Sequence, residues 1–196
     1  MAKASKAAQK SGALFAAPEA ASPPPRHVVA HIDGGARGNP GPSAYGVVIE
    51  DQKRHRLAEL SKFLGAHTNN HAEYCGLIAA LEYAQQYHHA ALRVVSDSEL
   101  LVKQMRGEYK VKSPELRPLY DQARKLSAGL KWFSIEHVPR EKNRVADRLA
   151  NQAINRATGK QAPTGAGKTM GVVRNGVVEL EGELPEGARV WVRVMR

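Results

Sequence analysis

Short alternations of apolar and polar residues run through the first third of the chain. The pattern predicts strands over residues 27–32, 44–50 and 56–63. A stretch dense in Gly and Pro separates the first two strands, and polar residues 51–54 separate the last two. Both connections are typical of antiparallel neighbours, so the segment predicts three antiparallel strands.

Helical spacing replaces this alternation from residue 68 onward. Thr68 and the two asparagines after it supply helix-capping chemistry, and apolar residues then recur at helical spacing as far as Ala84. The later pattern predicts a strand over 92–95, a helix over 99–105, a helix from 113, a strand over 131–138 and a helix over 141–156.

The resulting order, β-β-β-α-β-α-α-β-α, predicts an α/β fold for residues 27–157. Strands joined through helices become parallel neighbours, whereas strands joined by hairpins are antiparallel. The sheet is therefore expected to be mixed, with helices flanking it.

The two ends of the chain differ from this domain. Residues 1–26 are rich in Ala, Ser, Lys and Pro and predict a disordered, weakly basic tail. Residues 158–169 predict a linker, and residues 170–196 predict a small β-unit with strands over 172–174, 177–180 and 189–194. Three short strands bury little surface, so we expect this unit either to dock on the domain or to self-associate.

The linker contains PTGAGKT over residues 163–169, which is similar to a nucleotide-binding phosphate loop. A full loop needs a glycine where Ala162 stands, and it needs a preceding strand and a following helix. Only 27 residues follow Thr169, too few for a nucleotide-binding domain. We interpret the segment as a linker and expect no ATP binding.

The overall charge favours a polyanionic partner such as nucleic acid. The formal net charge is +10, from 29 Lys+Arg against 19 Asp+Glu, although a basic protein without such a partner fits it equally well. The single cysteine, Cys75, excludes an internal disulfide framework and fits a reducing cytoplasm. The sequence has no run of 18 apolar residues and no apolar core of a secretory signal, so we expect a cytoplasmic protein that does not enter a membrane.

Four acidic residues fall at the boundaries of the predicted elements. Asp33 ends the first strand, Asp97 follows the fourth, Glu73 lies in the first turn of the long helix and Asp147 lies early in the last helix. The carboxyl ends of parallel strands meet at one sheet edge, so we expect all four to share a site. Singly, each has an ordinary explanation as a turn, cap, first-turn or surface residue.

Convergent carboxylates are costly without a counter-charge, because like charges repel and lose hydration. Mg²⁺ prefers hard oxygen ligands, and two such ions roughly 4 Å apart can activate a water and stabilise the leaving oxygen of a phosphodiester. The sequence has no Cys/His cluster that would indicate zinc. The acids therefore predict two Mg²⁺ ions, with Mn²⁺ as a substitute.

Four motifs resemble those of type 1 ribonucleases H. They are DGGARGNPG over 33–41, TNNHAE over 68–73, SDS over 96–98 and NRVAD over 143–147. The resemblance implies the ribonuclease H-like fold with a five-stranded mixed sheet. It also implies two-metal hydrolysis of the RNA strand of RNA–DNA hybrids, leaving 3′-hydroxyl and 5′-phosphate ends, with Asp33, Glu73, Asp97 and Asp147 as the catalytic metal ligands.

The same resemblance implies substrate contacts. Asn39 and Asn70 would contact the minor groove of the hybrid, where the RNA 2′-hydroxyls lie, and Thr68 would contact a DNA phosphate. Gly34 and Gly35 would let the backbone approach the RNA closely. The alternative explanations are turn formation for Asn39 and helix capping for Thr68 and Asn70.

Two features depart from the family pattern. His137 lies ten residues before Asp147, where the family uses a mobile histidine for proton transfer or product release. Its loop continues through Pro139 instead of a flexible Gly/His stretch, so His137 is either catalytic or a strand-end residue. The basic protrusion of many bacterial members is replaced by the short stretch 107–114, so Lys110, Lys112, the tails or a partner would have to hold the substrate.

Two other functions fit the sequence less well. A non-catalytic module that binds hybrid or double-stranded RNA would not need four convergent carboxylates. A related two-metal nuclease could act on another nucleic acid, such as a DNA junction. Asn39 and the Gly34–Gly35 pair, which suit contact with 2′-hydroxyls, favour a hybrid over an all-DNA substrate.

Overall fold

The computed structural model describes residues 23–159, 171–174 and 176–180. The elements are β1 (Val28–Ala36), β2 (Gly41–Glu50), β3 (Arg56–His67), α1 (Asn69–Gln86), β4 (Ala91–Ser96), α2 (Glu99–Met105), α3 (Arg117–Ala128), β5 (Trp132–His137), the 3-10 helix η1 (Arg140–Lys142), α4 (Arg144–Ala157), β6 (Gly171–Arg174) and β7 (Val177–Leu180).

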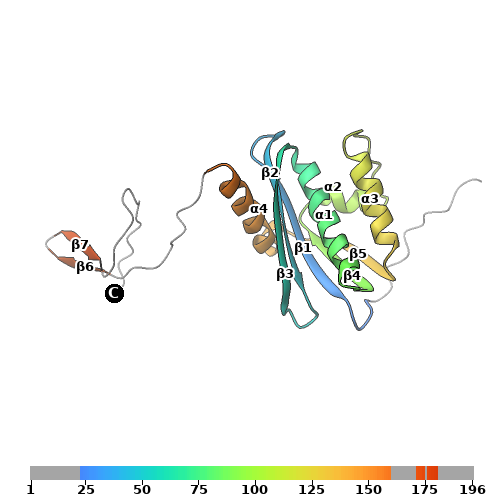
Figure 1. Cartoon of the computed structure of the whole chain (residues 1–196), viewed down its shortest axis with the longest axis horizontal. Coiled ribbons are helices and arrows are strands. Elements are labelled where there is room, and N and C mark those ends of the chain that lie inside the picture. The colour runs from blue at the N-terminus through green and yellow to red at the C-terminus, as the bar shows by residue number, and fades with distance from the viewer. Residues whose placement is uncertain (1–22, 160–170, 175, 181–196) are drawn as a thin grey trace, which may run out of the picture.

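Five strands form one mixed sheet in the order β3-β2-β1-β4-β5 (Figure 1). The pairs β1–β2 and β2–β3 are antiparallel, whereas β1–β4 and β4–β5 are parallel. Parallel neighbours need crossover connections, and here α1 precedes β4 while α2 and α3 connect β4 to β5. The predicted fold, a five-stranded mixed sheet flanked by helices, is confirmed.

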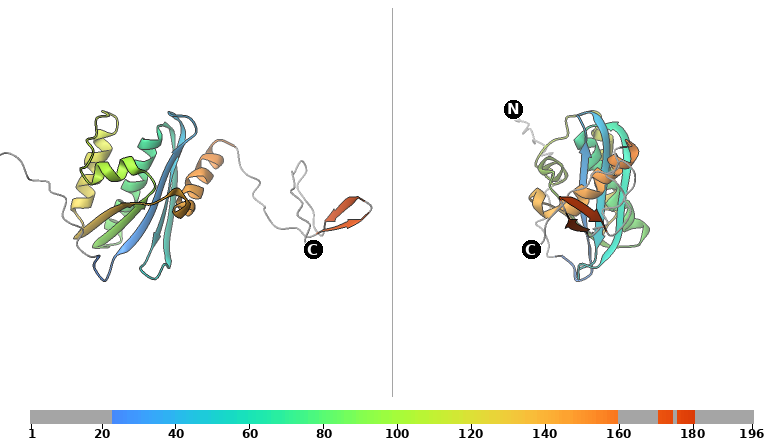
Figure 2. Two further views of the ribbon diagram at one scale, coloured as in Figure 1. Left: turned by 180° about the vertical axis from the view of Figure 1, so that it is seen from behind. Right: turned by 90° about the vertical axis from the view of Figure 1, so that its left-hand side faces the viewer.

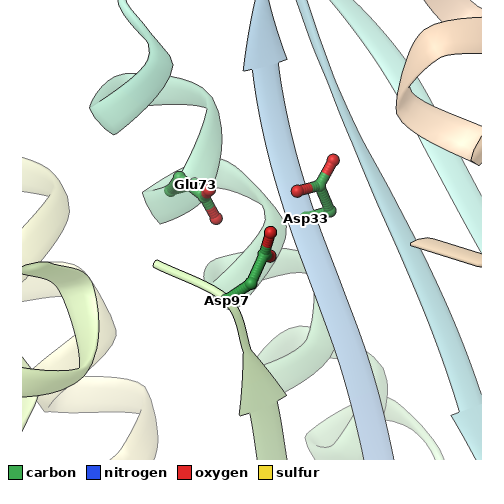
Figure 3. A group of neighbouring side chains, drawn as sticks. All are labelled: Asp33, Glu73 and Asp97. Atoms are coloured by element: carbon green, nitrogen blue, oxygen red, sulfur yellow. The ribbon is translucent and has the colours of Figure 1, made fainter. Parts of the chain in front are cut away.

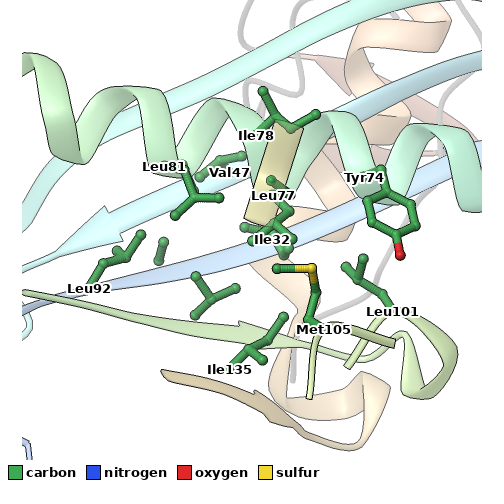
Figure 4. Close-up of a cluster of buried hydrophobic side chains, with 14 of the residues drawn as sticks. Ile32, Val47, Tyr74, Leu77, Ile78, Leu81, Leu92, Leu101, Met105 and Ile135 are labelled. Atoms are coloured by element: carbon green, nitrogen blue, oxygen red, sulfur yellow. The ribbon is translucent and has the colours of Figure 1, made fainter. Parts of the chain in front are cut away.

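Helices cover both faces of the sheet. α1, with α3 packed against it, lies on one face over β1 and β2, and α4 lies on the other face over the same two strands (Figures 1 and 2). The main core fills the α1 face, where Ile32, Val47, Leu77, Leu81 and Leu92 are fully buried (Figure 4). Each such side chain contributes about 1.5–3 kcal/mol on burial, so β1, β4 and α1 form a rigid support for the residues at their ends.

β1 extends further than the sequence predicted. The strand was expected to stop at Asp33, but the observed strand continues to Ala36 because residues 34–36 pair with β2. Only the parallel pairing with β4 stops early, at Ile32 and Ser96. Asp33 therefore lies inside a strand, beside the point where β4 ends.

Other boundaries shift for similar reasons. β2 begins at Gly41 and β3 continues to His67, both longer than predicted, because they pair with each other along this whole length. The last helix begins at Arg144 and not at residue 141, since η1 precedes it. Element boundaries thus depend on pairing partners that a local pattern does not contain.

Part of the predicted C-terminal β-unit is described as the β6–β7 hairpin. Most of the predicted tail, most of the linker with its phosphate-loop-like stretch, and the strand predicted over 189–194 lie outside the described residues. Within the described part of the chain, no helix combines the length and apolar character needed to cross a bilayer.

Candidate active site and metal centre

Three carboxylates from separate elements converge beside the carboxyl end of β4. Asp33 comes from β1, Glu73 from the second turn of α1 and Asp97 from the residue after β4. One oxygen from each lies within 4.8 Å of the other two, and Figure 3 shows the three side chains grouped around one point. Asp33 and Glu73 are only 6% and 8% exposed.

The strand register and a glycine explain this convergence. Ile32 pairs with Ser96, so the next residues, Asp33 and Asp97, are neighbours across two parallel strands. A Cβ at Gly34 would lie 2.2 Å from the backbone nitrogen of Glu73, so α1 can pack this closely on β1 only where a side chain is missing. A side chain at Gly34 would thus collide with α1, whereas one at Gly35 would meet open space, and both glycines line the pocket.

A second glycine brings α4 to the same pocket. Gly46 pairs with Asp33 across β1–β2, and a Cβ there would lie 2.2 Å from the carbonyl oxygen of Ala146. α4 therefore packs tightly on β2 and places Asp147 at a pocket of about 300 Å³ that Asp33, Glu73 and Asp97 also line. Asp147 is not part of the three-acid cluster, and Arg140 Nη2 donates to its Oδ1 at 2.6 Å.

The acids disfavour each other's charged forms. Burial, followed by the charges of Asp97 and Asp147, raises the pKa of Asp33 from 3.8 to about 7. Burial and the charges of Asp33 and Asp97 raise the pKa of Glu73 well above its usual value. The Arg140 guanidinium opposes the pKa shift of both carboxyl groups without cancelling it. The cluster therefore requires an additional positive charge to be fully ionised.

A divalent cation fits this donor set. Among the described residues, Glu73 Oε2 is buried without a hydrogen-bond partner, so it is free to act as a ligand. The cluster contains carboxylates only, and hard oxygen ligands suit Mg²⁺ or Mn²⁺ rather than zinc. A bound cation would satisfy Glu73 and offset the repulsion that raises the pKa values of Asp33 and Glu73.

Asn143 is a positioning residue that the sequence analysis quoted only as part of a motif. It is 2% exposed, and its Nδ2 donates to Asp97 Oδ1 at 2.8 Å and to the Ile32 carbonyl oxygen at 2.7 Å. The Asn143 side chain thus holds Asp97 close to Ile32, the last residue of β1 that pairs with β4. The position suggests a helix cap for α4, but its side chain makes no capping bond, so the local sequence gave no reliable signal for this role.

Arg140 is another residue that the sequence analysis did not single out. It lies in η1, lines the pocket beside the acids and has a side chain that is 72% exposed. The hydrogen bond to Asp147 and the charge of that residue raise the pKa of the guanidinium above its usual value, so it is always charged. An exposed cation at the edge of an acidic pocket is suited to contact a phosphate.

The residues predicted to contact substrate lie around the start of α1 and the loop after β1. Asn39 Oδ1 accepts from the backbone N–H of Asn69 at 3.0 Å, and Asn69 Oδ1 accepts from the backbone N–H of Ala36 at 2.6 Å. These two bonds tie the β1–β2 loop to the start of α1. Thr68 caps this helix, since its Oγ1 accepts from the backbone N–H of His71 at 3.3 Å. Asn69, which the sequence analysis did not single out, lines the pocket, whereas the described lining does not include Asn39, Thr68 or Asn70. Asn70 is half-buried.

His137 is not brought together with the acids. It is the last residue of β5, pairs with Ser96 and is exposed. The described residues that line the pocket include Arg140 but not His137. The connection between α2 and α3, where a basic protrusion would stand, contains no helix and exposes Lys110 and Lys112.

Comparisons with known proteins place this arrangement in a family. The family model described as Reverse transcriptase-like matches residues 31–153. Bifunctional protein Rv2228c of Mycobacterium tuberculosis is 47% identical over 131 residues, which cover 66% of this chain and 36% of that protein. Ribonuclease HI of Halobacterium salinarum is 43% identical over 130 residues, covering 66% and 65%. Ribonuclease H of Pelobacter propionicus is 33% identical over 159 residues, covering 74% and 93%.

Solved structures give the same result. The N-terminal RNase H domain of Rv2228c from Mycobacterium tuberculosis has a TM-score of 0.66 at 45% identity, covering 69% of this chain and 98% of that one. LC11-RNase H1, solved in complex with an RNA/DNA hybrid, has a TM-score of 0.64 at 43% identity, covering 67% and 99%. The chain spans about a third, 36%, of the length of the mycobacterial relative. Since the family model covers most of the domain and one ribonuclease H is matched over 93% of its length, this chain belongs to the ribonuclease H family.

Proposed function

We propose that this protein is a metal-dependent endonuclease that hydrolyses the RNA strand of RNA–DNA hybrids and leaves 3′-hydroxyl and 5′-phosphate ends. The convergence of Asp33, Glu73 and Asp97 to within 4.8 Å carries the proposal. The hybrid bound to LC11-RNase H1, 43% identical to this chain, supports the substrate class. The net charge of +10 agrees with a polyanionic substrate.

In this proposal, Asp33, Glu73, Asp97 and Asp147 hold two Mg²⁺ ions, and Mn²⁺ can substitute. Bound metal would supply the positive charge that lowers the pKa of an attacking water and stabilises the leaving oxygen. The four acids need no large rearrangement for this role, because three already converge and Asp147 lines the same pocket.

Two further residues support the acids. Asn143 keeps Asp97 in a fixed orientation through its bonds to Asp97 and to Ile32. When substrate binds, Arg140 would release Asp147 and bind a substrate phosphate instead. Its guanidinium would stay paired, and the Asp147 carboxylate would be free to bind metal. Because the Arg140 side chain is exposed, this exchange requires only a rotamer change.

Substrate recognition is proposed for the rim of the pocket. Asn39 and Asn70 would contact the hybrid where RNA presents 2′-hydroxyls, and Thr68 would contact a DNA phosphate in addition to capping α1. The open space at Gly35 permits close approach of the RNA, and Gly34 contributes by letting α1 pack behind it. A cytoplasmic location, expected from the sequence, belongs to the same proposal.

His137 stays a candidate for proton transfer or product release. Its exposed place at the end of β5 gives it freedom to move, but within the described residues it does not line the pocket. Arg140, which does line the pocket, is the stronger candidate for a direct contact with the reacting phosphate.

The proposal is tested with Asp97→Asn and a matched control. The variant keeps the side-chain shape and should bind a labelled hybrid as the native chain does, while cleavage in Mg²⁺ or Mn²⁺ falls to background. Asp121→Asn removes an exposed acid of α3 whose one ion pair within the described residues is with Arg117, so it should cleave normally. Retained turnover by Asp97→Asn, or equal cleavage of an all-DNA duplex by the native chain, would contradict the proposal.

A further inference from the structure

The two faces of the β6–β7 hairpin differ in polarity. Val173 pairs with Val178, and directly opposed residues share one face of an antiparallel pair. The other face carries Val172, Val177 and an ion pair between Arg174 and Glu179 at 3.9 Å. The Val173/Val178 face has no charged group in the described strands, and these two valines are 56% and 36% exposed.

A two-stranded hairpin is marginally stable in water by itself. An apolar face on a hairpin of this size therefore needs a surface that covers it. The chain offers such a surface at the edge of the main sheet, where β3 ends the strand order and pairs only with β2 among the described strands. β3 has 12 residues, about twice the length of the opposite edge strand β5 with 6.

A groove lies beside this free edge. It has a volume of about 520 Å³ between β3 and α1. Leu60, Ala79, Tyr83 and Tyr87 give it apolar surface, and charged side chains, Glu59, Lys62 and Glu82, also line it. The rings of Tyr83 and Tyr87 lie 4.4 Å apart, and Tyr87 is 55% exposed. Long unpaired edges with apolar surface beside them are aggregation-prone, and native proteins usually cover them.

The C-terminal segment can reach this edge. α4 ends at Ala157 in contact with β3, where Arg156 Nη2 donates to Ser61 Oγ at 3.3 Å. Residues 158–170 separate α4 from β6, and a chain of this length spans at most about 45 Å. The whole of β3 is about 40 Å long, so every position along it is within reach.

We propose that the β6–β7 hairpin docks on the free edge of β3 in the same chain, with its Val173/Val178 face covering the groove between β3 and α1. A second copy could offer the same surface. However, a short tether raises the local concentration of the attached hairpin to the millimolar range, well above usual protein concentrations. The domain therefore binds its own hairpin in preference to that of another molecule. This inference does not depend on the proposed nuclease activity.

Hydrogen exchange on the full chain tests the docking. Val173→Asp/Val178→Asp places two charges on the docking face, and Val172→Asp/Val177→Asp is the matched control with the same two substitutions on the opposite face. In the native chain and the control, the β3 amides that do not pair with β2 should exchange at least about tenfold more slowly than in Val173→Asp/Val178→Asp. Amides of β1 and β4, in the core, should be unchanged.

A second variant tests the groove from the other side. Tyr87→Asp alters an exposed residue remote from the acidic cluster and should speed exchange of the same β3 amides without loss of the domain's circular dichroism. Light scattering should give a monomer for all these proteins. Equal exchange of β3 in the native chain and in Val173→Asp/Val178→Asp, or β3 protection that rises with protein concentration together with a dimer mass, would overturn the proposal.

Discussion

Replacing Asp33 by Asn should increase the stability of the metal-free protein while removing its activity. Burial and the charges of Asp97 and Asp147 raise the pKa of Asp33 from 3.8 to about 7. A shift of roughly three units at about 1.4 kcal/mol each means that charged Asp33 lowers the free energy of unfolding by up to about 4 kcal/mol. Asn keeps the shape of the side chain but carries no charge.

The sign of the pH dependence follows from the direction of the shift. Because the pKa of Asp33 is higher in the folded than in the unfolded protein, the penalty is absent below about pH 4, grows as the pH rises and is complete above about pH 7. In EDTA, the native chain should therefore lose stability between pH 5 and pH 8. Asp33→Asn should lose less stability over this pH range, and at pH 8 it should melt about 10 °C higher than the native chain.

Thermal unfolding followed by circular dichroism in EDTA at both pH values measures this effect. Asp121→Asn is the matched control, because Asp121 is exposed and its pairing with Arg117 contributes little, so its melting temperature should stay within about 3 °C of native. If Asp33→Asn melts below the native chain at pH 8, or shows the same loss between pH 5 and pH 8, the account of an uncompensated acidic cluster is wrong.

Three further predictions concern the cation and the residues around it. Mg²⁺ should raise the melting temperature of the native chain at pH 8 but not that of Glu73→Gln, as differential scanning fluorimetry would show; equal stabilisation would exclude Glu73 as a ligand. Asn143→Ala should shift the Mg²⁺ dependence of cleavage to about 10- to 100-fold higher concentration, because Asp97 loses its orienting bond. An unchanged Mg²⁺ dependence would show that Asn143 does not position Asp97 for metal binding. Arg140→Ala should reduce kcat/KM for a labelled hybrid more than His137→Ala does, since only Arg140 of the two lines the pocket; the reverse order in steady-state assays would favour His137 as the residue that acts on the phosphate.

Local patterns sufficed to predict the elements of the fold. Period-two alternation, helical spacing and Gly or Pro stops identified every strand and α-helix of the described domain, because each element buries one side or one face. The mixed sheet followed from the connections alone. The lengths of β1, β2 and β3 did not follow, since they depend on pairing between strands far apart in the sequence.

The acids were predictable and their supports were not. Asp33, Glu73, Asp97 and Asp147 were singled out by their places at element ends, and the structure brings the first three together and puts Asp147 at the same pocket. The bond from Asn143 to Asp97 joins residues 46 positions apart, so no local pattern could reveal it.

The two buried glycines illustrate the same limit. Gly34 stood in a motif and suggested approach to RNA, but the structure shows that α1 occupies the space beside it. The strand pattern did not single out Gly46, although this glycine lets α4 pack on β2 at the point opposite Asp33. Which backbone approaches a glycine is decided by tertiary packing, and this information is absent from the sequence around it.

The most direct test of the central claim is cleavage of a 5′-labelled RNA strand paired with DNA by the native chain, with Mg²⁺ and with EDTA in its place. We expect internal cuts in the RNA that end in 3′-hydroxyl groups, that require the metal and that disappear in Asp97→Asn. An intact RNA strand in Mg²⁺ and in Mn²⁺, or cleavage that persists in EDTA, would contradict it.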